Sequence, residues 1–125
     1  MIRLTLEFTD NLGPEADMPV LLRKLDARLR AAPIDGAHVL AAIRVLTDFI
    51  APAAGGGWAT VILALRAPAS MEPVVAACAE DLFRLADAHL TELYLRHSIV
   101  VSLQLDLTGG APLERRHVKP ADMTF

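Results

Sequence analysis

A strand–helix–strand order that occurs twice is the feature of this sequence that most constrains its fold. Apolar and polar side chains alternate over residues 2–9, which predicts a strand with one apolar face. Apolar residues then recur at helical spacing from about 18 to 31, after Asp17, which we expect to cap that helix. A nearly continuous apolar stretch over 38–50 follows and predicts a strand that is covered on both faces.

The second half of the chain repeats this order. Residues 59–66 alternate again and predict a third strand. Ser70 is expected to cap a second helix, whose apolar stripe extends to Leu93. Alternation over 99–107 predicts a fourth strand, and the polar sequence from Thr108 onward is expected to form a tail or a terminal hairpin.

These elements predict an α+β fold in one domain, with a duplicated β-α-β arrangement. The domain covers residues 1–125, and its pseudo-repeat halves cover about 1–56 and 57–125. Right-handed crossovers place both helices on one face of a four-stranded mixed sheet. The other face then has no cover within the chain. Because 54% of the residues are hydrophobic, a high share for a small domain, we expect other subunits to cover that face.

Composition argues against several classes of protein. A membrane span is not expected, because the longest uncharged stretch, 49–65, contains Pro52 and three consecutive glycines. A net charge of −3 offers no positive field for nucleic acid. A single cysteine, Cys78, allows no internal disulfide and fits a reducing compartment, so the cytoplasm is expected.

The histidines give no sign of a metal site. They are scattered along the chain and do not show the spacing of metal ligands, at His38, His89, His97 and His117. His89 lies on the apolar stripe of the second helix and is expected to be partly buried and hydrogen-bonded, with catalysis as the less favoured reading. We therefore expect neither a metal nor a cofactor.

Three segments carry a resemblance to a known family. The opening segment Met1–Asn11 is an alternating strand that ends in Asp-Asn. The segment Leu40–Arg44 reads Leu-Ala-Ala-Ile-Arg, and Glu80–Phe83 reads Glu-Asp-Leu-Phe in the second helix. In their order and spacing these segments resemble the 5-carboxymethyl-2-hydroxymuconate isomerases of the tautomerase superfamily, and the resemblance covers nearly the whole chain.

The resemblance implies a homotrimer with its sheets around a three-fold axis. It also implies a role in aromatic catabolism, with proton transfer between carbons of an unsaturated dicarboxylate. In that family, removal of the initiator Met exposes a proline whose secondary amine is the general base, and arginines hold the substrate carboxylates. On this resemblance, Arg44 and Arg66 are the candidate substrate-binding residues of this chain.

Residue 2 departs from the family pattern, because it is Ile where the family has Pro. The initiator Met is removed when the second residue is small, so Met1 is expected to remain and the nitrogen of Ile2 to be an amide without basicity. The α-amino group of Met1, with an unperturbed pKa of about 7.7–8.0, is then the candidate catalytic base. A second departure is Ala69, which stands where the family has an Arg, so that Arg66 is the nearest arginine.

Arg44 admits two interpretations. It lies within an apolar strand, where an unpaired buried charge is very costly. It can clamp a substrate carboxylate, which the bidentate geometry of arginine suits. It can also form an ion pair with an Asp or Glu of another subunit, which is the interpretation that we favour.

Two classes of function remain open at this stage. The chain can be an isomerase of enol or dienoate acids with altered or weak activity. It can also be a homotrimer that kept the fold, and with it a pocket for a small dicarboxylate or enol acid, but lost the chemistry. Residue 2 separates the two classes and favours the loss.

Overall fold

The structure is a computed structural model of the 125-residue chain. It describes residues 2–33, 38–46, 58–96, 98–108 and 113–119. For residues 58, 108 and 113–119 only the backbone is described. Met1 and His97 therefore lie outside the described residues.

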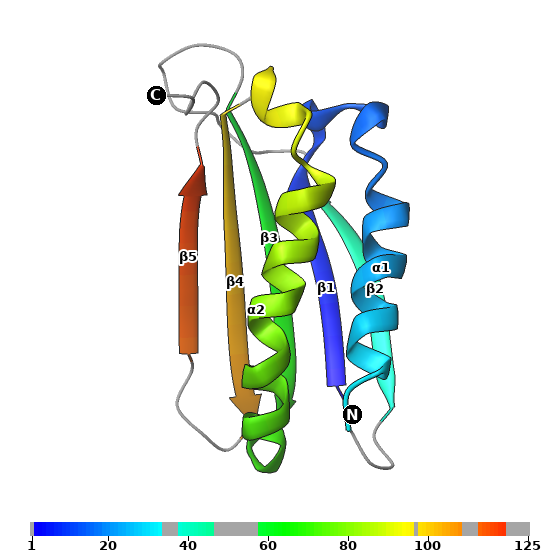
Figure 1. Ribbon diagram of the computed structural model, residues 1–125, viewed down its shortest axis with the longest axis vertical. Helices are drawn as coiled ribbons and strands as arrows, with labels where there is room; N and C mark the ends of the chain where they lie inside the picture. Colours follow the sequence, from blue (N-terminus) through cyan, green and yellow to red (C-terminus); the bar gives the residue numbers. More distant parts are fainter. Residues whose placement is uncertain (1, 34–37, 47–57, 97, 109–112, 120–125) are drawn as a thin grey trace.

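Five strands form one mixed sheet. They are β1 (Ile2–Thr9), β2 (Val39–Leu46), β3 (Trp58–Pro68), β4 (Ser98–Thr108) and β5 (Leu113–Lys119). Their order across the sheet is β2-β1-β3-β4-β5 (Figure 1). β1 is parallel to β2, and β3 is parallel to β4, whereas the β1–β3 and β4–β5 pairs are antiparallel. The four predicted strands are confirmed, and the polar C-terminal region adds a fifth.

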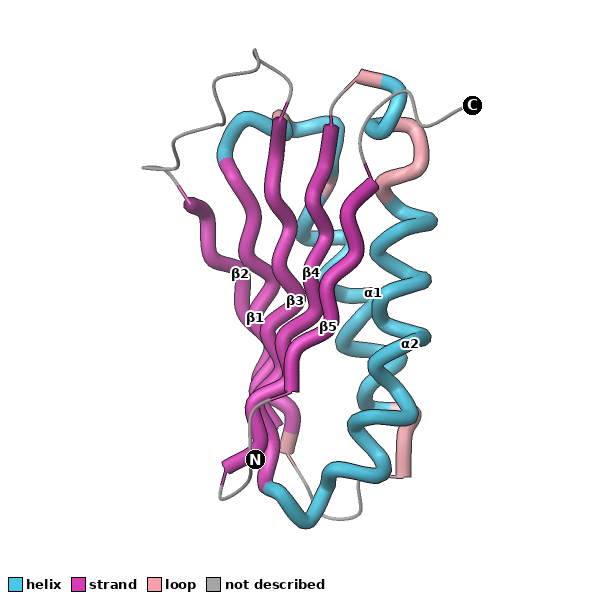
Figure 2. The backbone as a smooth tube through the Cα atoms, turned by 90° about the vertical axis from the view of Figure 1, so that its left-hand side faces the viewer, coloured by secondary structure: helices cyan, strands magenta, loops and turns pink. Residues whose placement is uncertain are grey.

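Two helices cover one face of this sheet. They are α1 (Met18–Arg30) and α2 (Glu72–His89), which lie side by side on the same side of the strands (Figure 2). The predicted α+β class, with duplicated β-α-β units and both helices on one face, is therefore confirmed. Neither helix in the described part of the chain is long and apolar enough to cross a membrane.

The expected helix caps differ from the observed ones. Ser70 lies in a 3₁₀ turn, Ala69–Met71, and α2 begins only at Glu72, so the prediction that Ser70 caps α2 is wrong. Asp17 does occupy the N-cap position of α1, but its side chain makes no capping hydrogen bond there. The φ angle of Asp17 is 45°, which lies in the left-handed region that Asp tolerates better than most residues. This backbone conformation turns the chain into α1.

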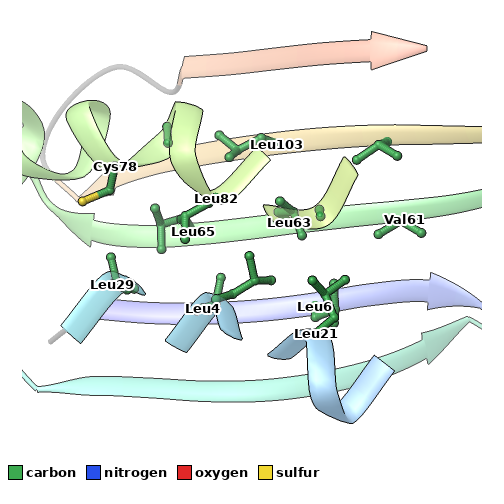
Figure 3. Packing of buried hydrophobic residues seen from close by; sticks show 14 of the residues in the cluster. Leu4, Leu6, Leu21, Leu29, Val61, Leu63, Leu65, Cys78, Leu82 and Leu103 are labelled. Carbon is green, nitrogen blue, oxygen red and sulfur yellow. The ribbon is translucent and has the colours of Figure 1, made fainter. Parts of the chain in front are cut away.

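A core of aliphatic side chains fills the space between the helices and the sheet. Leu4 and Leu6 of β1 lie beside Leu63 and Leu65 of β3, because the antiparallel register pairs Leu4 with Leu65 and Leu6 with Leu63 (Figure 3). The helices contribute Leu21, Leu25, Leu29, Val75, Cys78 and Leu82 to the same cluster. The apolar face that two-residue alternation gives the strands thus packs against the apolar faces that helical spacing gives α1 and α2, and together they form one apolar layer.

β2 is an edge strand, and within one chain the helices leave much of it uncovered. Leu40, Ile43 and Val45 are 50%, 36% and 46% exposed. The expectation that this strand is covered on both faces therefore does not hold within a single chain. Apolar side chains at both parities here provide an exposed apolar edge, which a soluble protein normally covers.

The open face of the sheet is more polar than expected. Arg3, Thr5 and Glu7 project from β1 on this side, and Arg66 and Asp106 project from β3 and β4. Charged side chains cannot be buried without partners. The exposed apolar surface is therefore concentrated on β2, and the centre of the open face is suited to contact with water or a polar ligand.

Replacing Leu63 by Ala tests the central position of β3 in the core. Leu63 is fully buried, so Leu63→Ala should lower the free energy of unfolding by about 2–5 kcal/mol. Urea denaturation at a fixed protein concentration measures this loss. The matched control is Leu95→Ala, which should change stability by less than about 0.5 kcal/mol because Leu95 is 69% exposed. Equal effects of the two changes would contradict the observed packing.

Candidate functional site: a polar cavity on the open face

Strand pairing brings two arginines and an aspartate into one row across the open face. The antiparallel register places Arg3 of β1 opposite Arg66 of β3. The parallel register of β3 and β4 then places Asp106 on the other side of Arg66. Since paired residues project on the same side of a sheet, the three side chains are neighbours.

This row forms one end of a cavity of about 320 Å³. The cavity is lined by residues of the three central strands, Arg3, Thr5, Glu7, Ala64, Leu65, Arg66, Gln104 and Asp106. Its volume is at the lower end of the range for small-molecule sites, about 300–1,000 Å³. The cavity can therefore hold a small organic acid.

Arg66 is held in place by Asp106. Its Nε donates a hydrogen bond to Oδ2 of Asp106 at 3.1 Å, and its Nη2 lies 3.0 Å from the same carboxylate oxygen. The two side chains are 60% and 51% exposed, so the pair contributes little to stability, about 0–1 kcal/mol. Its effect is geometric, because it fixes the plane of the guanidinium at the edge of the cavity.

Arg3 supplies the uncompensated positive charge at this end. It makes no hydrogen bond or ion pair with any side chain that the structure describes, and its direct neighbour on β3 is Arg66. Like charges directly opposite each other on a sheet are unfavourable. A bound anion relieves this repulsion, and a carboxylate matches the planar fork of a guanidinium. The geometry therefore supports carboxylate binding at the Arg3–Arg66 row.

The amino-terminal end of the chain is close to this row in sequence. Ile2 precedes Arg3, and its backbone N–H donates to the carbonyl oxygen of His38 at 2.7 Å. This nitrogen therefore takes part in the pairing of the sheet and is not a base. The proposed base, the α-amino group of Met1, belongs to a residue outside the described ranges.

Arg44 lies on the open face beside the Glu7 end of the cavity. Its side chain is exposed on β2 and it is paired in register with Glu7, four residues along β1 from Arg3. At 3.3–3.4 Å per residue, this offset is about 13 Å. Arg44 does not line the cavity, so the two predicted substrate-binding arginines, Arg44 and Arg66, are not brought together within one chain.

Sequence reasoning missed Arg3, Gln104 and Asp106 as components of the site. Strand alternation indicates that these three side chains project from the open face, since each lies between apolar residues that point to the core. Their proximity could not, because it depends on the register between strands that are about 60 and 40 residues apart in sequence.

Two candidate residues from the sequence, His89 and Cys78, lie in the interior or at its edge and are held there by packing and polar contacts. His89 is half-buried, and its Nε2–H donates to the carbonyl oxygen of Ala16 at 2.7 Å, while Nδ1 lies 3.2 Å from Nζ of Lys24. Cys78 is buried, with Sγ 3.6 Å from Nη1 of Arg28. Within the described ranges, no three His, Cys, Asp or Glu residues are grouped as metal ligands.

Comparison with known proteins relates this chain to others by its structure. No family model matches the sequence, and no curated protein matches it. Among solved structures, a 5-carboxymethyl-2-hydroxymuconate isomerase from Deinococcus radiodurans R1 is similar at a TM-score of 0.70 and 27% identity. That alignment covers 93% of this chain and 90% of the other.

A second solved structure shares the fold. It is a 5-carboxymethyl-2-hydroxymuconate delta-isomerase, with a TM-score of 0.66 and 24% identity over 89% of this chain and 83% of the other. At this identity the likeness concerns the fold. The fold and the three sequence segments thus indicate the same resemblance, which is to the 5-carboxymethyl-2-hydroxymuconate isomerases.

Proposed function

We propose that this protein binds a small unsaturated or enol acid in the cavity on the open face and moves a proton on it slowly. The family resemblance implies an unsaturated dicarboxylate, and the proposal requires only that the ligand present one carboxylate to the arginines. The observation that carries the proposal is the Arg3–Arg66 row at the end of β1 that adjoins the amino terminus. Arg66 and Arg3 bind the carboxylate, and the α-amino group of Met1 is the base. Activity is low because Ile2 replaces the proline of the family.

The proton transfer follows from the chemistry of an acid held in this way. A carboxylate fixed by arginines lowers the cost of negative charge that develops on the conjugated system when a C–H proton leaves. An amine with a pKa near 8 can accept that proton near neutral pH and return it to another carbon. A primary amine displaced by one residue from the position of the family's proline is a poorer base because geometry limits proton transfer.

A second candidate function is acid binding without catalysis. It is favoured by the hydrogen bond from the Ile2 amide to His38, which commits the nitrogen at position 2 to the sheet. The two functions share the carboxylate site and differ only in the base, so variants of residue 2 and of Arg66 separate them.

We also propose that the protein is a homotrimer in which neighbouring subunits cover the apolar edge strand β2. The proposal is supported by the exposed side chains of Leu40, Ile43 and Val45. Arg44 lies among them on the same strand and, in this assembly, forms an ion pair with a carboxylate of the neighbouring subunit. The polar cavity remains open to solvent beside that interface.

Removing the guanidinium of Arg66 tests carboxylate binding. Arg66→Ala should weaken the binding of cinnamate, a simple unsaturated acid, about tenfold or more, because one charged hydrogen-bond donor pair is lost. Isothermal titration calorimetry measures the change. Arg23→Ala is the matched control, since Arg23 is exposed on α1, away from the cavity. Equal affinities of the two variants would contradict a site at Arg66.

Replacing Ile2 by Pro tests the role of the base. Ile2→Pro should permit removal of Met1 and expose a secondary amine beside the Arg3–Arg66 row. We expect the rate of keto–enol proton exchange to rise, since general-base catalysis contributes about 10²–10⁴-fold. The gain should be at the lower end of this range, because Ala69 stands where the family has another arginine. Exchange is followed by NMR in deuterated water, after mass spectrometry has confirmed the free proline.

The double variant Ile2→Pro, Arg66→Ala provides the control for this gain. It should lose most of the added exchange, because the base remains but the carboxylate site does not. Exchange at the solvent rate in Ile2→Pro would leave acid binding without catalysis as the function. A wild-type rate equal to that of proline-bearing relatives would contradict the argument from Ile2.

Sedimentation equilibrium tests the assembly and the role of Arg44. The wild type should sediment at three times the 13.5 kDa of one chain at micromolar concentration. Arg44→Ala should destabilise the trimer by about 3–5 kcal/mol, the usual cost of breaking a buried pair, whereas Arg23→Ala should leave it intact. A monodisperse wild-type monomer would contradict the assembly, and loss of cinnamate binding by an intact Arg44→Ala trimer would assign Arg44 to the ligand.

A further inference from the structure

The cavity on the open face has opposite charges at its two ends. Arg3 and Arg66 lie at one end with Asp106, and Glu7 lies at the other, four residues along β1. Its lining therefore carries two positive and two negative side chains, and its net charge is zero. A ligand with two carboxylates gains at the first end but meets a like charge at the second.

Neutral polar groups separate the two charged ends. The register places Thr5 of β1 beside Ala64 of β3, and Ala64 beside Gln104 of β4. This middle row is about 7 Å from the row of Arg3 along the strand, at 3.3–3.4 Å per residue. A flat, unsaturated chain can lie over the small side chain of Ala64 and reach from the arginines toward Glu7.

The Glu7 carboxylate is available to a ligand. It makes no hydrogen bond or ion pair with the side chains that the structure describes, and its neighbour on β3 is Ile62, which offers no donor. Arg44 is its register neighbour on β2 and projects on the same face, but the structure shows no ion pair between the two and Arg44 does not line the cavity. A carboxylate without an internal donor favours a ligand group that donates a hydrogen bond.

From this arrangement we infer that the ligand is a monocarboxylic acid whose far end carries a hydrogen-bond donor, such as a hydroxyl or ammonium group, and not a dicarboxylate. Arg3 and Arg66 bind its carboxylate, and Glu7 accepts the hydrogen bond from its far end. Glu7 is thus the specificity-determining residue. This inference rests on the proposed function for the carboxylate end, and for the far end it replaces the second carboxylate that the family resemblance implies with a hydrogen-bond donor.

Three rigid acids of the same shape test this polarity. Cinnamate has no polar group at its far end, 4-hydroxycinnamate has a donor there, and 4-carboxycinnamate has a second carboxylate. We expect 4-hydroxycinnamate to bind the wild type about tenfold more tightly than 4-carboxycinnamate, as a hydrogen bond to a charged group provides. Isothermal titration calorimetry at fixed ionic strength gives the three dissociation constants.

The variant Glu7→Gln identifies the group responsible. It should reduce the preference for 4-hydroxycinnamate to less than about threefold, mainly because 4-carboxycinnamate binds more tightly once the repulsion is removed. Glu92→Gln is the matched control, because Glu92 is exposed in the helical layer, and it should keep the wild-type preference. Circular dichroism confirms that both variants are folded.

Each other outcome overturns the inference in a recognisable way. Tighter binding of 4-carboxycinnamate by the wild type, or an unchanged preference in Glu7→Gln, removes Glu7 from the site and leaves the proposed function standing. A tenfold loss of 4-carboxycinnamate affinity in Arg44→Ala assigns the far end to Arg44 and has the same consequence. Failure of all three acids to bind, cinnamate included, overturns the proposed function as well.

Discussion

The antiparallel pairing of β1 with β3 is the interaction on which the rest of the structure depends. It joins the two β-α-β halves, and its register decides both faces of the sheet at once. One set of pairs, Leu4 with Leu65 and Leu6 with Leu63, forms the centre of the core. The alternate set places Arg3 opposite Arg66. Because the side-chain period in a strand is two, a slip of one residue would bury the arginines and expose the leucines.

The sequence predicts the elements well because their signals are local. Alternation in the first strand and the 3.6-residue period of α1 require no knowledge of distant segments, and both were correct to within a residue or two. Propensity failed where a local alternative exists, as at Ser70, which lies in a 3₁₀ turn before α2. For the polar sequence after Thr108 a tail and a terminal hairpin both remained open, and the antiparallel pairing of β5 with β4 is the hairpin; local signals could not decide, because a polar edge strand is stabilised by its pairing and not by an apolar face.

The candidate site could be predicted only in part for the same physical reason. The family resemblance indicated Arg66, and Arg66 lines the cavity. Nothing local indicated Asp106 as its partner, since the two residues are 40 positions apart and meet through the parallel register of β3 and β4. Arg44 was expected to be buried because its strand is apolar. Burial depends on the position of that strand in the sheet, and an edge position leaves it exposed.

The exposed apolar edge of β2 has a consequence for the tendency of the chain to aggregate. β2 pairs with β1 on one side only, so among the described strands its other row of peptide groups has no partner, beside the exposed Leu40 and Val45. An uncovered edge of this kind can pair with any other extended segment, which is a route to aggregation. Arg44 is an exposed charge on the same strand, and a charge on an edge strand is a feature that disfavours such pairing. Removal of charge from this strand should therefore raise the tendency of the isolated chain to aggregate.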